Sequence, residues 1–134
     1  TLPANVLATD GDALRITMSF RCDAGVQNKR IRIYFGGTAL LDSSAIANTS
    51  QVFNVQLYIT RTGATAQYCQ GAIIGTAVHN VWSTTLNGDC NFPADPGKTL
   101  SATQIIKATV QQGAVTALNA VIQDMLIVEY LRKP

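Results

Sequence analysis

The residues on which most enzymatic and metal chemistry depends are scarce in this sequence. The 134 residues include one histidine, His79, and three cysteines, none of them in a Cys-x-x-Cys pair. A cluster of histidines around a metal ion is therefore excluded, and the spacing of a zinc site is missing. No Gly-x-Ser-x-Gly motif, the turn that carries the nucleophile of many hydrolases, accompanies His79. We predict that the protein is not an enzyme and binds no cofactor or metal ion.

The cysteines, Cys22, Cys69 and Cys90, form an odd set, so they cannot all pair within one chain. Cys22 continues the apolar face of an alternating segment, which is typical of a small buried side chain. For the other two, a bridge between Cys69 and Cys90 is the alternative to separate thiols.

Charge is also low, at 13% of the residues, whereas about 25% is usual in soluble domains. Ten Lys and Arg face eight Asp and Glu, and no basic run exceeds two residues, so we expect no nucleic-acid partner. Nor does any apolar run approach the ~20 residues that cross a bilayer, so we expect no membrane partner. A hydrophobic content of 47% with so few charges favours a subunit whose surface is partly covered in an oligomer or assembly, although a polar Thr, Asn, Gln and Ser surface is the alternative.

What the sequence does have is a two-residue alternation of apolar and polar side chains, the pattern of half-buried antiparallel strands. Residues 1–134 are expected to form a single domain, because this length suits one core. The fold class predicted is all-β: one antiparallel β-sandwich, jelly-roll-like, of about eight strands. The expected strands are residues 13–22, 30–35, 38–42, 52–60, 65–74, 76–86, 99–112 and 121–131, with a long loop over 87–97.

Gly36 and Gly37 separate two of these strands. Paired glycines permit a turn with positive φ, which a β-branched residue adopts only at a cost. We expect a corner there, followed by an edge strand over residues 38–42.

The last strand is apolar on both faces. Strict alternation places Ile122, Leu126, Val128 and Tyr130 on one face and Met125, Ile127 and Leu131 on the other. Such a strand is either central, with its outer face covered, or part of a subunit interface, and we favour the interface. The predicted interface residues are Met125, Leu126, Ile127, Val128, Tyr130 and Leu131.

Four arginines fall on the outward registers of two strands that we expect to be neighbours: Arg15, Arg21, Arg30 and Arg32. A solvated sheet face is one interpretation of this basic strip. The other is a docking strip for an acidic partner surface, because Arg suits interface ion pairs.

Two further groups suggest weaker hypotheses. Asp10 and Asp12 fit a turn before the first long strand, with their carboxylates capping local N–H groups, better than a catalytic pair. Trp82 and the tyrosines, with Tyr34 and Tyr58 on outward registers, are typical of a carbohydrate platform and equally of a protein interface.

Three segments carry a family resemblance. They are LPANVLATDGDALRI at 2–16, KRIRIYFGGTALLDSSA at 29–45 and YITRTGATAQ at 58–67. Together they resemble small structural proteins of tailed bacteriophages, which share the Leu-Pro-Ala-Asn opening, the Asp-Gly-Asp turn, the basic strand ending in Tyr-Phe-Gly-Gly and the Arg-Thr-Gly-Ala hairpin. The resemblance implies a non-enzymatic β-sandwich or jelly roll of the virion, usually trimeric, in head decoration proteins, head fibres or tail-fibre tips.

The function expected on these grounds is a homotrimeric decoration or cement protein on the outer surface of the phage head, bound to the major capsid protein or another virion protein. The alternative is the receptor-binding tip of a tail or head fibre that recognises a host-surface glycan or protein. If that alternative holds, we expect aromatic and acidic loop residues to cluster at one exposed end of the domain, for example Trp82, Asp89, Phe92 and Asp95.

Overall fold

The computed structural model describes residues 1–22, 29–42, 51–75, 97–112 and 121–134. These residues contain seven strands: β1 (Ala13–Cys22), β2 (Lys29–Phe35), β3 (Thr38–Asp42), β4 (Gln51–Gly63), β5 (Ala66–Gly75), β6 (Ile106–Gln112) and β7 (Val121–Leu131). The prediction of an all-β fold is confirmed. The strand expected over 76–86 and nearly all of the loop expected over 87–97 lie outside the described residues.

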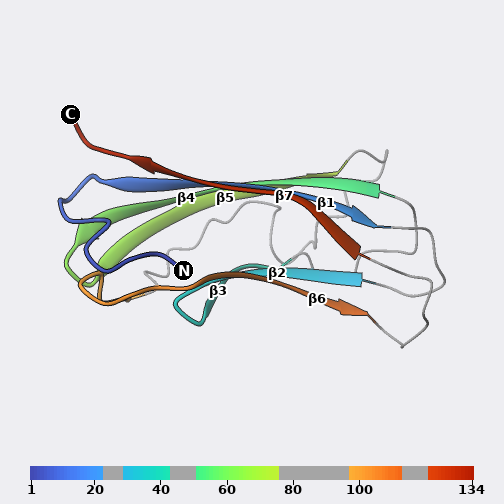
Figure 1. Cartoon of the computed structure of the whole chain (residues 1–134), viewed down its shortest axis with the longest axis horizontal. Helices are drawn as coiled ribbons and strands as arrows, with labels where there is room; N and C mark the ends of the chain where they lie inside the picture. Colours follow the sequence, from blue (N-terminus) through green and yellow to red (C-terminus); the bar gives the residue numbers. More distant parts are fainter. Residues whose placement is uncertain (23–28, 43–50, 76–96, 113–120) are drawn as a thin grey trace.

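The strands form two antiparallel sheets that lie one above the other (Figure 1). One sheet has four strands in the order β5-β4-β1-β7, and the other has three in the order β3-β2-β6. The first described strand pairs with the last, and the second pairs with the last but one. The molecule is therefore the predicted β-sandwich. No helix long enough and apolar enough to span a membrane occurs in its described residues.

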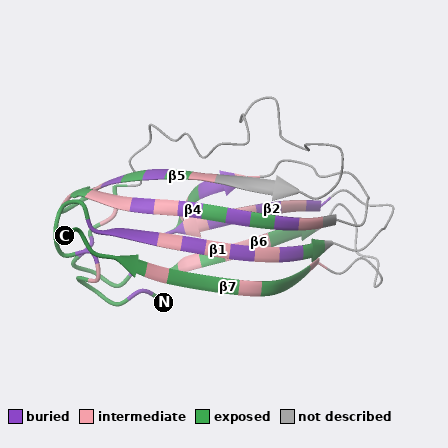
Figure 2. Cartoon of the chain, turned by 90° about the horizontal axis from the view of Figure 1, so that it is seen from above, coloured by how far each residue is buried: buried purple, intermediate pink, exposed green. Residues whose placement is uncertain are grey.

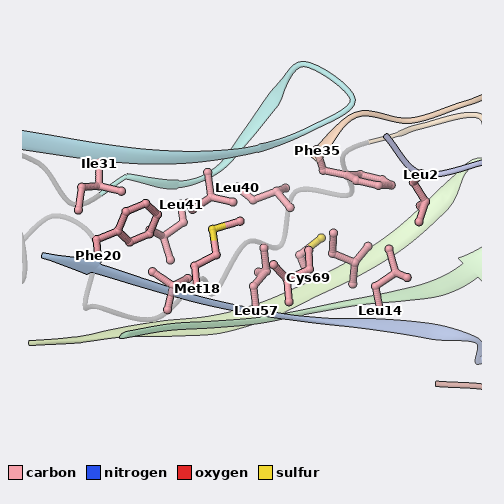
Figure 3. Packing of buried hydrophobic residues seen from close by; sticks show 14 of the residues in the cluster. Leu2, Leu14, Met18, Phe20, Ile31, Phe35, Leu40, Leu41, Leu57 and Cys69 are labelled. Atoms are coloured by element: carbon pink, nitrogen blue, oxygen red, sulfur yellow. The ribbon is translucent and has the colours of Figure 1, made fainter. Parts of the chain in front are cut away.

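The core lies between the sheets, where the apolar registers of the strands face one another (Figure 3). The apolar side chains at alternating positions of β1, β2 and β4 are at most 3% exposed. They are Leu14, Ile16, Met18 and Phe20, then Ile31, Ile33 and Phe35, then Phe53, Val55, Leu57 and Ile59. The alternation in the sequence thus gives the correct buried face of each of these strands.

Two segments without regular strand structure close one end of the core. Leu2 and Leu7 in the N-terminal segment and Leu100 in the segment before β6 are buried in the same cluster. The prediction of a strand from residue 99 onward is wrong, because β6 begins only at Ile106. Residues 99–105 instead form a turn and a single bridge between Leu2 and Gln104, which places Leu100 over the end of the sandwich.

The turn between β2 and β3 is the predicted glycine corner. Gly36 has a φ of 53° and Gly37 a φ of 84°, and positive φ at both positions is the requirement of a tight type I′ hairpin turn. The β3 strand that follows is the edge strand of its sheet, as expected.

We expect Gly36→Val to lower the free energy of unfolding by about 1–3 kcal/mol. The positive φ is unfavourable for valine, and the added side chain also collides with its neighbours. A Cβ atom at Gly36 would run into the side chains of Gln104 and Lys98, whereas at Gly37 it would meet nothing within 4 Å. Gly37→Val is therefore the matched control, with a smaller loss. Urea unfolding of both variants measures the difference, and equal losses would show that the contact with Gln104 is unimportant.

Candidate functional site

The edge strand β7 carries the predicted interface residues, and its inner side is uncovered. Leu126, Val128 and Tyr130 lie directly opposite inward-facing residues of β1, so they belong to the core side of the sheet. Their partners on β1 are Met18, Ile16 and Leu14, which are at most 1% exposed. Leu126, Val128 and Tyr130 themselves are 49%, 41% and 46% exposed. The apolar face of the core therefore continues onto β7, where no other described strand covers it.

The two sheets differ in width, and this difference accounts for the exposure. Four strands lie over three, and β7 is the outermost strand of the wider sheet. Seen from above, β7 borders the molecule and is coloured as exposed along most of its length (Figure 2). On the opposing sheet, Val110 of β6 pairs with the buried Ile31 but is 40% exposed. In the part of the chain that the structure describes, one long side of the sandwich is thus exposed and apolar.

The outer side of β7 departs from the strict alternation of the sequence. Ser19 pairs with Met125 but Phe20 pairs with Gln123, so Asp124 is the extra residue of a β-bulge. The bulge turns Ile122 to the outer face, together with Met125, Ile127 and Leu131. The prediction that Ile122 shares a face with Leu126 is therefore wrong.

Among the described strands, β7 has a neighbour in its sheet only at β1, which does not favour the alternative of a central strand. Of the nine large hydrophobic side chains found exposed in the described part of the chain, six lie on β7. They are Ile122, Leu126, Ile127, Val128, Tyr130 and Leu131, while Met125 is half-buried. Apolar exposure is thus concentrated on one strand. That this strand forms an interface stays a prediction.

The four arginines do not form the predicted continuous strip. Arg15 and Arg21 lie on β1, and Arg30 and Arg32 lie on β2, but these strands belong to different sheets. The two strands are consecutive in the sequence but lie in different layers, whereas the prediction assumed neighbours within one sheet. Each pair therefore lies on its own outer face, and a docking role for either pair stays a prediction.

On the four-stranded sheet each arginine has its own carboxylate on β7. Arg15 donates from Nε and Nη2 to the two oxygens of Glu129, at 2.5 and 2.8 Å, and Arg21 donates from Nε to Asp124 at 2.8 Å. Hydrogen bonds from these arginines lower the pKa of both carboxyl groups. The charges on this face are therefore balanced, and the pairs hold β7 to β1.

On the three-stranded sheet two arginines share one carboxylate. Arg30 donates to both oxygens of Asp42, and the Nε of Arg32 donates to Asp42 at 3.0 Å. Arg32 also donates from Nη1 to Gln111 at 3.3 Å. Beside them, the ammonium group of Lys107 lies 5.1 Å from the centre of the Tyr34 ring. This face has more positive than negative side chains, a difference that the sequence alone did not reveal.

Asp12 has the capping role that the sequence predicted for the turn. The carboxylate accepts from the backbone N–H groups of Ala8 and Thr9, and it also accepts from the N–H of Lys133, just beyond β7. The Thr9 N–H lowers the pKa of Asp12 below its ordinary 3.8, and Lys133, Ala8 and the Tyr130 hydroxyl act in the same direction against desolvation. Asp12 therefore ties the N-terminal turn to the end of β7.

Two further carboxylates in the described residues, Asp10 and Asp42, also have partners. Asp10 accepts from Arg61 at 2.7 Å, and Asp42 holds its two arginines. No group of three or more His, Cys, Asp or Glu is arranged for a metal ion within the described ranges. Cys69 is buried in the core. Several sequence candidates lie outside the described residues: His79, Trp82, Asp89, Cys90, Phe92 and Asp95.

Comparison of the chain with models of known protein families, with curated proteins and with solved structures finds no match.

We expect Asp12→Asn to weaken the acid sensitivity of the fold. Because folding lowers the pKa of Asp12, its carboxylate stabilises the protein above the unfolded-state pKa, and this stability is lost as the pH falls through the folded-state pKa. The variant should therefore be less stable than the wild type at pH 7, and the difference should shrink below about pH 5.

Thermal unfolding across this pH range measures the effect. Asp10→Asn is the matched control, because its side chain is 61% exposed and pairs only with Arg61 among the described residues. If both variants change the pH dependence of stability equally, the hydrogen bonds of the Asp12 carboxylate are not its particular cause.

Proposed function

We propose that the protein is a non-enzymatic structural subunit of a bacteriophage virion and that it assembles with copies of itself through β7. The observation that carries the proposal is the uncovered apolar stripe of Leu126, Val128 and Tyr130, which continues the core of the sandwich beyond its covered width. Contiguous apolar surface of this kind marks interaction sites in soluble proteins.

The size of the surface suits a second copy of the chain. A fully exposed large apolar side chain presents on the order of 200 Å², so the six exposed residues of β7 offer roughly 500 Å² in each subunit. Two such surfaces together bury about 1,000 Å², the lower limit for a specific interface. Val110 of β6, on the same side of the sandwich, and the half-buried Met125 extend this area.

The strand also lacks the features that keep an edge from pairing. Natural edge strands are protected by lysine, proline, inward charges or bulges. From Met125 to Leu131, β7 has no lysine or proline, and its one charged residue, Glu129, is paired with Arg15 on the outer face. The bulge at Asp124 protects only the first part of the strand. The remaining seven residues are a regular apolar edge.

The family resemblance favours a trimer, and the place that we propose is the outer surface of a phage head, where the trimer would bind the major capsid protein or another virion protein. The receptor-binding tip of a fibre is the second candidate. Both are virion proteins that self-assemble, so the two candidates share the β7 interface and differ in the partner.

We expect the purified protein to have three times its 14.3 kDa subunit mass by light scattering. Leu126→Asp should reduce this to the monomer mass while the strand signal in circular dichroism is kept, because a charge in an apolar interface is strongly unfavourable. Tyr68→Asp is the matched control: Tyr68 is 48% exposed on β5, at the far edge of the same sheet, and its variant should stay trimeric. A wild-type monomer, or an assembly that survives Leu126→Asp, would contradict the role of β7.

The place in the virion is tested by labelling. An antibody against the purified protein should bind regularly over the heads of phage particles from cells that carry the gene, seen by electron microscopy with gold. Label confined to fibre ends would support the receptor-binding tip instead. Particles that lack the protein would overturn the virion proposal.

A further inference from the structure

The outer faces of the two sheets differ in charge. On the four-stranded sheet, Arg15 and Arg21 are matched by Glu129 and Asp124. On the three-stranded sheet, Arg30 and Arg32 share one carboxylate, Asp42, and Lys107 is a third cation on an outward register. Among the described residues Lys107 has no ion-pair partner. The excess positive charge of the outward-facing strand residues thus lies on one face.

We propose that this basic face, formed by Arg30, Arg32 and Lys107 around Asp42 and Tyr34, binds a protein surface rich in Asp and Glu. The inference rests on the proposed function, because it names the chemistry of the partner that the assembled subunit would decorate. Opposite charge on the two partners favours encounter and fixes orientation, so an acidic surface is the complement of this face.

The arginines are already held in position. Arg30 binds Asp42 with both Nε and Nη2, and Arg32 is held between Asp42 and Gln111. A guanidinium group has five N–H donors, and these contacts use only some of them. With 41% of the Arg30 side chain and 27% of the Arg32 side chain exposed, the remaining donors can reach a partner. Binding then costs little side-chain entropy, since the side chains are ordered beforehand.

The geometry favours carboxylates over nucleic acid. The fork of a guanidinium group matches two carboxylate oxygens, and Arg30 and Arg15 both show this arrangement within the chain. Binding of a nucleic-acid backbone gains affinity from many phosphate contacts, which three cations beside a carboxylate do not supply. The ring of Tyr34, which could stack on a base, has the ammonium group of Lys107 over one face.

The test is a titration of ¹⁵N-labelled protein with a decaglutamate peptide at low salt, followed by NMR. Saturable shifts should appear in the amides of β2 and β6 and be absent from β1 and β7, and they should be lost at high salt. Shifts spread over both sheets, or none that saturate, would overturn the proposal. Tighter binding of a single-stranded DNA decamer at the same residues would overturn it in favour of nucleic acid.

Matched variants distinguish binding by this face from binding through the overall positive charge of the protein. Arg30→Gln and Lys107→Gln should each weaken peptide binding several-fold. Arg21→Gln removes the same charge from the other face and should change binding less than twofold. Thermal unfolding checks that each variant folds, and Lys107→Gln removes no ion pair among the described residues. Equal weakening by all three variants would overturn a defined face.

Light scattering on the same samples separates this inference from the proposed function. A trimer that does not bind the peptide leaves the β7 assembly intact and removes only the acidic partner. A monomer that binds the peptide through β2 and β6 would support the acidic partner and would contradict the assembly through β7.

Discussion

The unequal width of the two sheets is the constraint on which the rest of the structure depends. In a β-sandwich a strand is buried only where the opposing sheet lies over it. Ile16 of β1 is covered and has no exposed area, whereas Val128 directly beside it on β7 is 41% exposed. The same chemical pattern therefore makes a core on one strand and an open apolar surface on the next. None of the described strands lies opposite β7, and in the assembly that we propose a second subunit covers that surface.

A strand that lies outside the covered core needs other anchors, and β7 has them. It pairs with β1 along its length, and the ion pairs of Arg15 and Arg21 cross that boundary on the outer face. At its end, Asp12 receives the N–H of Lys133 and the hydroxyl of Tyr130. These contacts hold the apolar strand in an ordered position before any partner binds, which reduces the entropy that assembly must overcome.

The sequence predicted the local features well and the long-range ones poorly. Alternation in residues 13–22 and the Gly36-Gly37 pair determine strand faces and a turn through short-range sterics, so both predictions were confirmed. The bulge at Asp124 depends on the register against β1, and the separation of Arg21 from Arg30 depends on a connection between sheets. Neither is visible in a two-residue period. For the same reason the apolar β7 was identified, but the charge difference between the two outer faces was not.

The self-assembly and the partner binding that we propose would use different parts of this fold, so the topology would make them compatible. The apolar side lies along the edge at β7, whereas the basic face is the broad outer surface of β2 and β6. Edge-to-edge contact between subunits would leave the broad faces free, and several copies would present the same basic face together. The overall affinity for an acidic surface would then exceed the affinity of one face, because the second and later contacts are intramolecular. A subunit with few charges could in this way bind firmly to a repeating surface, although the described strand residues of each single face supply only three cations and one carboxylate.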